Sequence, residues 1–268
     1  MLIAQISDCH LTTPGALTYG HVDTGDALAR IVAHVNAGAR PDMAIISGDL
    51  TNEGSEAEMR HAKTLLDGLD CPYRVLPGNH DLRAPMRKVF GDAHCPAPEG
   101  NFLNFTVELG GVRLIVLDSI LEGAPGGAFC DTRADWLADA LGGNLTTPTL
   151  IFLHHPPLPL GIPETDQDGF LEVEKIADIV VHYPNILRIC SGHIHLATQT
   201  LWHGILSVTA PSTVMELTRD FSETGWPSRF TKVAPGYLMH HLTKAGQMVS
   251  HVVEVPLDAQ TYPFASEV

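Results

Sequence analysis

The sequence predicts a layered α/β sandwich, because short buried strands alternate with amphipathic helices along its first 210 residues. The 268 residues are 44% hydrophobic and 18% charged, a composition that can fill a core and that excludes a disordered chain. This length accommodates one large domain, or one domain with a small appendage. An all-β fold would not explain the helical spacing between the strands.

Seven runs are expected to be buried strands, because each is short, apolar and β-branched and ends at a polar residue, glycine or proline. They are Leu2–Ser7, Met43–Ser47, Tyr73–Leu76, Arg113–Asp118, Thr149–Leu153, Leu187–Cys190 and Leu206–Thr209.

Four segments between these runs have the spacing of amphipathic helices. They are Thr24–Asn36, Ser55–Leu69, Arg133–Leu141 and Phe170–His182. In the first, Leu28, Ile31 and Val35 follow the i, i+3, i+7 spacing of one helix face. Ser55 and Glu58 have the spacing of a capping box, which predicts a helix start at that point.

The last part of the chain differs in composition from the rest. Residues 211–268 are polar and interrupted by Pro and Gly, with strand-like runs at Tyr237–Leu242 and Met248–Val255. We therefore expect residues 1–210 to form the main domain. The segment 211–268 could close the sheet, cap a site or form an oligomer contact, and the sequence leaves these three alternatives open.

The charge balance restricts the classes of partner. With 16 basic against 31 acidic side chains the formal charge is −15, which argues against binding long nucleic acids or anionic membranes. No run of 18 apolar residues predicts a membrane span. The first ten residues lack a basic start and are interrupted by Asp8 and His10, so we expect no signal peptide and a cytoplasmic protein. Five widely spaced cysteines without a C-x-x-C pair predict reduced thiols.

Polar side chains follow five of the predicted strands, at the point where each strand ends. These clusters are Asp8-Cys9-His10, Gly48-Asp49, Gly78-Asn79-His80-Asp81, His154-His155 and Gly192-His193-Ile194-His195. Because ligand sites in open α/β sheets lie at the carboxyl ends of the strands, we expect these side chains to converge at one edge. One such cluster alone would mean little, but five in order predict a site.

The residue types in these clusters are those that bind hard or borderline divalent ions. Carboxylates and imidazoles are such ligands, and Asn79 adds an amide oxygen. Asp49 lies in the middle of the set, and a carboxylate can bridge two ions. The candidate ligands are seven residues of these clusters, namely Asp8, His10, Asp49, Asn79, His154, His193 and His195. With Asp49 counted twice, they supply four ligands to each of two ions, an arrangement that clamps a phosphoryl group during displacement.

These motifs resemble those of the calcineurin-like metallophosphoesterase superfamily. The length, the block His154–Pro157 and the loop with Tyr19 are similar to bacterial class III cyclic-nucleotide phosphodiesterases and glycerophosphodiesterases. The resemblance implies a four-layer αββα sandwich of two mixed sheets, a catalytic domain over residues 1–210, and a homodimer or larger homo-oligomer. It also implies two ions drawn from iron, manganese, zinc and cobalt.

The resemblance further implies a role for each residue of the motifs. The first ion would be held by Asp8, His10, Asp49 and His195, and the second by Asp49, Asn79, His154 and His193. His80 would touch the phosphate or protonate the leaving group, while a metal-activated hydroxide attacks phosphorus.

Several neighbouring residues have two open interpretations. Asn79 and His80 are expected to contact substrate, and His155 and Tyr19 either contact substrate or merely pack. Asp81 either orients His80 or caps the next segment. Asp118 is expected to be structural. His240 and His241 match no motif, and a place at the rim of the site is the less favoured interpretation for them.

The leading functional hypothesis is a phosphodiesterase that acts on small diesters such as cyclic nucleotides or glycerophosphodiesters. A phosphomonoesterase or protein phosphatase is the enzymatic alternative. A scaffold that has lost catalysis would be expected to lack a ligand, and none is missing here. The sequence therefore favours an enzyme.

Overall fold

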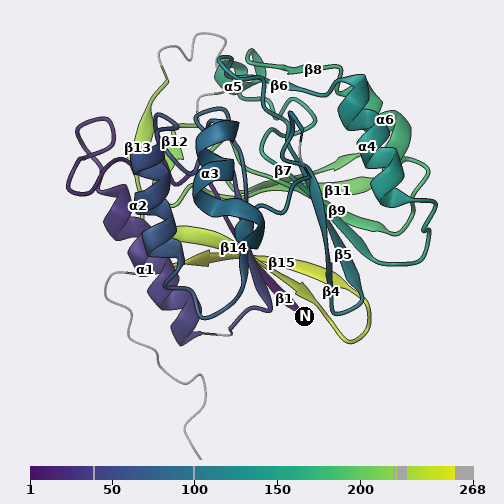
Figure 1. The fold of residues 1–268 in the computed structure, drawn as a ribbon, viewed down its shortest axis with the longest axis horizontal. Helices are drawn as coiled ribbons and strands as arrows, with labels where there is room; N and C mark the ends of the chain where they lie inside the picture. Colours follow the sequence, from purple (N-terminus) through teal and green to yellow (C-terminus); the bar gives the residue numbers. More distant parts are fainter. Residues whose placement is uncertain (39, 99, 220, 222–227, 257–268) are drawn as a thin grey trace, which may run out of the picture.

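Two mixed β-sheets pack face to face in the computed structural model, which describes residues 1–38, 40–98, 100–219, 221 and 228–256. Helices cover the outer faces of both sheets (Figure 1). The predicted α/β sandwich is therefore confirmed. The end of the predicted C-terminal segment, residues 257–268, lies outside the described residues, as do 220 and 222–227.

The first sheet has the strand order β15-β14-β1-β2-β3. Its strands are β1 (Leu2–Ile6), β2 (Met43–Ser47), β3 (Tyr73–Leu76), β14 (Gly236–Leu242) and β15 (Met248–Glu254). β1, β2 and β3 are parallel, while β14 runs antiparallel to β1 and to β15. The C-terminal part of the chain thus supplies two of the five strands.

The second sheet has the strand order β10-β11-β9-β7-β5-β4. Its strands are β4 (Phe105–Leu109), β5 (Val112–Leu117), β7 (Thr149–Leu153), β9 (Ile186–Ser191), β10 (Thr198–Trp202) and β11 (Ile205–Thr209). β5, β7, β9 and β11 are parallel, and β4 and β10 are antiparallel edge strands. The central strands are buried on both faces, which explains their continuous apolar runs.

Helices form the two outer layers, as Figure 1 shows. They are α1 (Thr24–Ala37), α2 (Glu56–Leu66) and α3 (Arg83–His94) on the first sheet, and α4 (Asp131–Leu141) and α6 (Glu174–Val180) on the second. The capping box is confirmed, because Ser55 Oγ accepts from Glu58 N while the Glu58 carboxylate accepts from Ser55 N. Smaller elements lie above the sheets. They are α5 (Pro163–Asp166) and the strand pairs β6 (Gly127–Ala128) with β8 (Phe170–Leu171) and β12 (Met215–Leu217) with β13 (Phe230–Lys232).

Two helices differ from the sequence expectation. The predicted helix from Phe170 begins only at Glu174, because residues 170–171 pair as β8 and Glu172 has a left-handed φ of 58°. α3 was not predicted; it lacks a side-chain cap and has non-helical backbone angles at Gly91, and both weaken the sequence signal.

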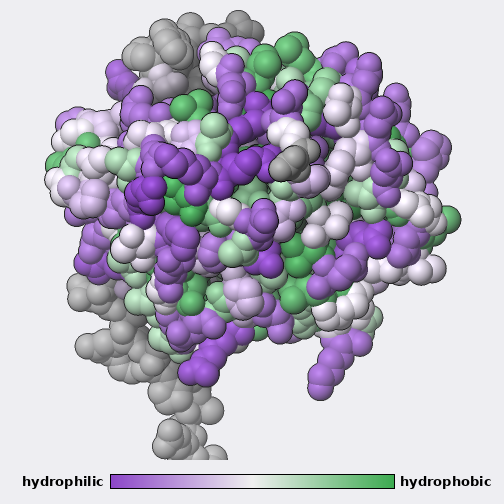
Figure 2. Space-filling view, viewed as in Figure 1, coloured by the Kyte–Doolittle hydropathy of each residue, from purple (hydrophilic) through white to green (hydrophobic). Residues whose placement is uncertain are grey.

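The surface and the thiols follow from the composition. On the face shown in Figure 2, hydrophilic side chains spread over most of the surface and hydrophobic ones occur in small groups. All five cysteines are unpaired, as the sequence predicts, and Cys9 is fully buried. Among the described residues, no helix is both long and apolar enough to cross a bilayer.

Candidate active site

The carboxyl ends of the parallel strands of both sheets meet at one edge of the sandwich. Asp8, Asp49 and Asn79 follow β1, β2 and β3 of the first sheet. His154 and His193 follow β7 and β9 of the second sheet. The structure thus brings together side chains from five strands that lie far apart in the sequence.

The backbone at this edge adopts conformations that are rare for side chains with a Cβ atom. Five of the seven predicted ligands have positive φ angles. They are Asp8 (54°), His10 (45°), Asp49 (47°), His193 (72°) and His195 (59°). Left-handed φ values in non-glycine residues cost energy and cluster at functional sites. The strain therefore coincides with the predicted ligand set.

The motif glycines let these chain segments approach closely. A Cβ atom on Gly48 would lie 2.3 Å from His154 Nδ1, and one on Gly78 would lie 2.2 Å from Asp49 N. One on Gly192 would lie 2.0 Å from Ser7 Oγ. Any side chain at these positions would push the strand ends apart.

Asp8, His10, Asp49 and His195 form the first group of ligand-type side chains, with one ligand atom of each within 4.8 Å of the others. His10 Nε2 lies 2.9 Å from His195 Nε2 and 3.6 Å from Asp49 Oδ2. His195 Nε2 lies 3.7 Å from Asp8 Oδ1. These are the four residues predicted for the first ion.

The second group adjoins the first at Asp49. His154 Nε2 lies 3.4 Å from Asp49 Oδ2 and 3.1 Å from Asn79 Oδ1. His193 Nδ1 also lies 3.1 Å from Asn79 Oδ1. A single oxygen, Asp49 Oδ2, therefore lies within 3.6 Å of an imidazole from each group.

Burial dominates the electrostatics of the two groups. It raises the pKa of Asp8 and lowers that of His10 well below its ordinary value. Burial also opposes ionisation of Asp49, but His154 outweighs it and the pKa of Asp49 lies well below its usual range. The pKa of His154, which burial alone would lower, is raised to about 9 by Asp49. Nearby positive charge therefore outweighs burial at Asp49, whereas burial outweighs it at Asp8.

Main-chain carbonyls orient three of the imidazoles. His154 Nδ1 lies 3.0 Å from Ser47 O, and His195 Nδ1 lies 2.8 Å from Met215 O. His80 Nδ1 lies 2.8 Å from Asn52 O. Since a carbonyl only accepts, each of these Nδ1 atoms carries the proton. When these imidazoles are neutral, as metal ligands must be, the Nε2 atoms of His154 and His195 are left as acceptors that face the ligand groups.

The hydrogen bonds of Asp81 give it a role other than orienting the His80 imidazole. Its carboxylate accepts from the backbone N–H groups of Leu50, Thr51 and Gly78 at 3.0 Å each. It therefore joins the loop after β2 to the loop after β3, the two loops that carry Asp49 and Asn79.

His155 supports a loop rather than pointing freely into the site. Its Nδ1 lies 2.8 Å from Ser119 Oγ, and its Nε2 lies 3.0 Å from Pro125 O. The carbonyl requires the proton on Nε2, so Nδ1 accepts from the Ser119 hydroxyl. One nitrogen each of His154, His155 and His193 lie within 4.8 Å of one another, but both nitrogens of His155 already have partners.

A pocket of about 420 Å³ opens over the two groups. His10, Asp49, Asn79, His80, His193 and His195 form its floor, and the other described residues that line it are Tyr19, Pro125, Thr165, Asp168, Ile194, Leu217, Ser228, Arg229 and Phe230. Tyr19 is 51% exposed, with its ring centroid 5.8 Å from that of Phe230. A second cavity of about 240 Å³ shares Thr165, His193 and Ile194 with it.

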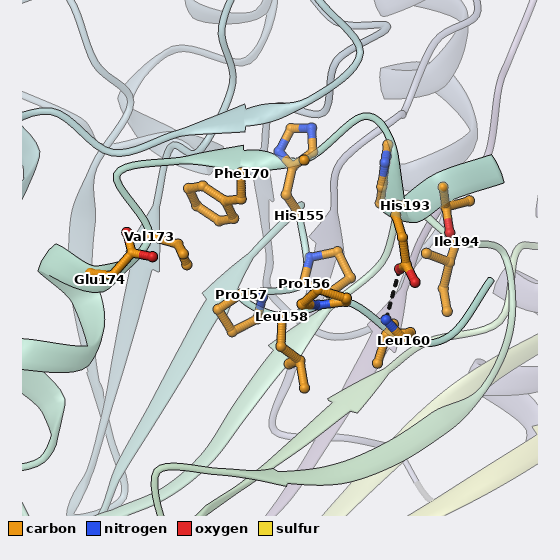
Figure 3. A pocket seen from close by; sticks show the side chains of 14 residues that line it. His155, Pro156, Pro157, Leu158, Leu160, Phe170, Val173, Glu174, His193 and Ile194 are labelled. Carbon is orange, nitrogen blue, oxygen red and sulfur yellow. Dashed lines mark hydrogen bonds between the residues drawn. The ribbon is translucent and has the colours of Figure 1, made fainter. Parts of the chain in front are cut away.

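Figure 3 shows this second cavity, with Phe170 and Val173 on one side and His193 and Ile194 on the other. Pro156 and Pro157 contribute to its lining. Its lining therefore combines apolar residues with polar ones such as His155, Asp166 and Glu174.

The family assignment follows from the motifs in this site. Residues 1–197 match the model of the calcineurin-like phosphoesterase family. The chain belongs to this family. The resemblance found in the sequence is thereby confirmed, and the match spans every predicted ligand from Asp8 to His195.

Named relatives of this phosphoesterase are phosphodiesterases. It is 31% identical to a probable glycerophosphodiester phosphodiesterase GpdQ from Arcobacter nitrofigilis, over 100% of this chain and 98% of the relative. It is 28% identical to the 3′,5′-cyclic adenosine monophosphate phosphodiesterase CpdA of Pseudomonas aeruginosa, over 95% of this chain and 90% of the relative. It is 30% identical to a cAMP/cGMP dual specificity phosphodiesterase of Mycobacterium tuberculosis, over 90% and 76%.

Solved structures support the fold of this phosphoesterase. A dimetal phosphatase from Danio rerio superposes with a TM-score of 0.66 at 14% identity, covering 96% of this chain and 99% of that one. A purple acid phosphatase from yellow lupin gives a TM-score of 0.69 at 12% identity, covering 98% and 52%. The predicted calcineurin-like fold is confirmed by these likenesses.

Sequence reasoning missed several residues that line the pocket of this phosphoesterase. Thr165 lies in the short helix α5, and Asp168 and Arg229 lie just before the short strands β8 and β13, away from the strand-end motifs. Asp168 Oδ2 lies 3.9 Å from Nε2 of the predicted ligand His193. No local pattern singled these residues out, because they reach the site only through the tertiary fold.

Two other predicted positions lie away from the pocket floor. Asp118, expected to be structural, is fully buried and accepts from the Arg83 guanidinium at 2.7 and 2.8 Å. His240 is fully buried between the sheets, so the interpretation that places it at the rim of the site is wrong. Its position on β14, beside β1, explains this burial.

Proposed function

We propose that this phosphoesterase is a metal-dependent phosphodiesterase that hydrolyses small phosphodiesters, such as cyclic nucleotides or glycerophosphodiesters. The observation that carries the proposal is the place of Asp49 Oδ2, 3.6 Å from His10 Nε2 and 3.4 Å from His154 Nε2. One carboxylate oxygen between two groups of ligands can bridge a pair of ions, which together clamp a phosphoryl group. The activities named for the relatives support a diester substrate.

The donor atoms fit two divalent ions. We assign the first ion to Asp8, His10, Asp49 and His195, and the second to Asp49, Asn79, His154 and His193. His10 supports the fit, because its Nε2 lies 2.9 Å from that of His195, and within the described part of the chain its buried Nδ1 has no hydrogen-bond partner. Oxygen and imidazole ligands suit iron, manganese, zinc and cobalt. When bound, such ions neutralise phosphate oxygens and lower the pKa of a water molecule toward neutrality.

His80 is the residue that we assign to the leaving group. It lines the pocket beside the ligand groups, with its ring centroid 4.7 Å from that of His10. Its Nδ1–H donates to Asn52 O, so Nε2 carries a transferable proton only in the imidazolium form. In that form Nε2 can hydrogen-bond the phosphate and then protonate the leaving oxygen.

The wall of the pocket would hold the rest of the substrate. A volume of about 420 Å³ accommodates a small diester. Tyr19 and Phe230 offer an aromatic surface, and Asn79 offers a polar contact. We assign the described residues of the segment 211–256 to the same functional unit, since β14 and β15 complete the first sheet and Phe230 and Arg229 line the pocket. The homodimer expected from the resemblance stays a prediction that light scattering checks.

The proposal is tested by comparing a diester with a monoester. The purified chain is loaded with Mn²⁺, its metal content is measured, and bis(p-nitrophenyl) phosphate and p-nitrophenyl phosphate are assayed in parallel. We expect faster turnover of the diester. Preference for the monoester would make the protein a phosphomonoesterase, and bound metal without turnover of either would favour a scaffold. A panel of 3′,5′-cAMP, 2′,3′-cAMP and glycerophosphocholine then defines the natural class.

A further inference from the structure

A fully buried carboxamide links the two sheets beneath the proposed ion sites. Gln5 lies on β1, and its Nε2 donates to Ser47 Oγ and to Ser191 O, each at 2.9 Å. Ser47 ends β2 in the first sheet, and Ser191 ends β9 in the second. A buried amide that lacked such partners would cost free energy, so both of its N–H groups are used here.

The same carboxamide is fixed from the opposite side by a chain of hydrogen bonds. Gln5 Oε1 accepts from His240 Nε2 at 2.9 Å, and His240 Nδ1 lies 2.6 Å from Ser250 Oγ. Arg188 of β9 donates to the same Ser250 oxygen. Since Gln5 Oε1 only accepts, the His240 proton lies on Nε2, and Ser250 must donate to Nδ1. The donor and the acceptor of each hydrogen bond in this series are therefore determined.

This series of hydrogen bonds begins and ends on β9, a strand of the second sheet. It leaves β9 at Arg188, passes through β15, β14 and β1 of the first sheet, and returns to β9 at Ser191. Apolar contacts between sheets are non-directional, whereas hydrogen bonds fix one relative position. This ring of bonds thus holds β9 at a defined place against the first sheet.

The two strand ends that Gln5 holds are those that deliver proposed ligands of the second ion. Ser47 lies two residues before Asp49, and Ser191 lies two residues before His193. In addition, the Ser47 carbonyl lies 3.0 Å from His154 Nδ1 and orients that imidazole. A shift of Ser47 relative to Ser191 would therefore change the spacing of Asp49, His154 and His193 together.

We propose that Gln5, held in place by His240, is a positioning residue that sets the spacing of the second ion site across the two sheets. The inference rests on the proposed function in so far as Asp49, His154 and His193 bind that ion. Gln5 itself touches neither ion nor substrate. Its contribution is to metal affinity and to turnover, with little effect on substrate affinity.

The test compares Gln5→Leu with a control of matched burial. Tyr237→Phe removes another hydrogen bond of β14, the 3.1 Å contact between the hydroxyl of the buried residue Tyr237 and His34 Nδ1, and leaves the ring in place. Mn²⁺ is titrated into the metal-free full chain by calorimetry, and the paramagnetic resonance spectrum of the loaded protein reports coupling between two Mn²⁺ ions. Melting temperature, kcat and KM are measured alongside.

In Gln5→Leu we expect the affinity of the site that binds Mn²⁺ more weakly to fall about ten- to hundredfold. The resonance spectrum should change and kcat should fall, while KM should stay similar. Tyr237→Phe should lower the melting temperature and leave both Mn²⁺ affinities unchanged. If Gln5→Leu fails to fold, His240→Phe and His240→Gln decide. Only the latter can still donate to Gln5 and accept from Ser250, so it should restore Mn²⁺ affinity.

Two results would overturn the inference. One is wild-type affinity for both Mn²⁺ ions in Gln5→Leu and in His240→Phe, and the other is a wild-type chain with no second Mn²⁺ site. A wild-type chain that binds two Mn²⁺ ions without hydrolysing diesters would refute only the proposed function. The role of Gln5 would then still be decided by the Mn²⁺ titration.

Discussion

His10 Nε2 lies 2.9 Å from His195 Nε2 at the floor of the pocket. The Nδ1 of His195 already donates to Met215 O, so its Nε2 is an acceptor, while the buried Nδ1 of His10 has no partner among the residues that the structure describes. Two imidazole nitrogens that face one another can share a proton or bind one cation. This relationship underlies the predictions that concern metal.

Asp49→Ala should remove both ions and the activity together, because a carboxylate oxygen that lies close to both ligand groups is lost. Metal content by mass spectrometry and diester turnover check this. Asp42→Ala is the control, since Asp42 is exposed and its carboxylate accepts from Leu2 N at 2.7 Å, in another part of the fold. Retention of two ions with normal turnover in Asp49→Ala would contradict the ligand assignment.

His80→Ala should keep both ions and lower kcat by about 10²–10⁴, the usual effect of losing a general acid. The ligand groups stay in place because the contact of residue 80 with Asp49 Oδ1 is made by its backbone N–H, at 2.9 Å. His61→Ala is the matched control, since His61 Nδ1 bonds Thr12 O at 2.7 Å outside the pocket lining. A collapse of metal content in His80→Ala would instead make His80 a ligand.

Arg229→Ala should raise KM for a diester about tenfold while changing kcat less. Among the described residues that line the pocket, Arg229 is the only Lys or Arg, and a guanidinium attracts a phosphate anion. Steady-state kinetics at low and high salt check this, because screening should reduce the difference. Arg219→Ala is the control, since Arg219 pairs with Glu216 at 2.5 Å. An unchanged KM in Arg229→Ala would remove this residue from the substrate site.

His240 should make the fold less stable in acid. Burial, reinforced by Arg188, lowers the pKa of His240 to about 3, whereas an unfolded histidine has a pKa of about 6.5. Below pH 6.5 the unfolded chain therefore binds the extra proton, and stability is lost as pH falls from 6.5 toward 3. Arg188 is the charged group that faces the ring, and Phe152 packs on it.

Urea unfolding of the metal-free chain at pH 7 and pH 5.5 checks this dependence. When the pH is lowered from 7 to 5.5, the free energy of unfolding should decrease in both proteins. The decrease should be smaller by about 1.2 kcal/mol in His240→Gln than in the wild type. Tyr237→Phe, which retains His240, should keep the wild-type loss. Equal losses in His240→Gln and the wild type would show that His240 does not remain neutral in the fold.

Local patterns predicted the centre of the site. Asp8, Asp49 and His193 each follow a run of buried apolar residues, and the shared edge of parallel strands then implies that they meet. The strands Met43–Ser47 and Thr149–Leu153 have the predicted bounds for the same reason, since their buried runs end at polar or glycine signals.

The supporting contacts could not be predicted because they join distant parts of the chain. His195 is oriented by the carbonyl of Met215, and Gln5 is bonded to His240, 235 residues away. The insertion of β14 beside β1 depends on antiparallel pairing that no local periodicity encodes. Arg229 and Phe230 likewise reach the pocket through the β12–β13 pair.

Stepwise addition of Mn²⁺ to the metal-free chain, with bis(p-nitrophenyl) phosphate turnover measured at each ratio, tests the proposed two-ion phosphodiesterase most directly. The proposed ligand sets predict that turnover rises until two Mn²⁺ ions are bound per chain and then stays constant. Turnover that stops rising at one bound Mn²⁺ ion, or two bound ions without turnover, would contradict the proposed two-ion phosphodiesterase.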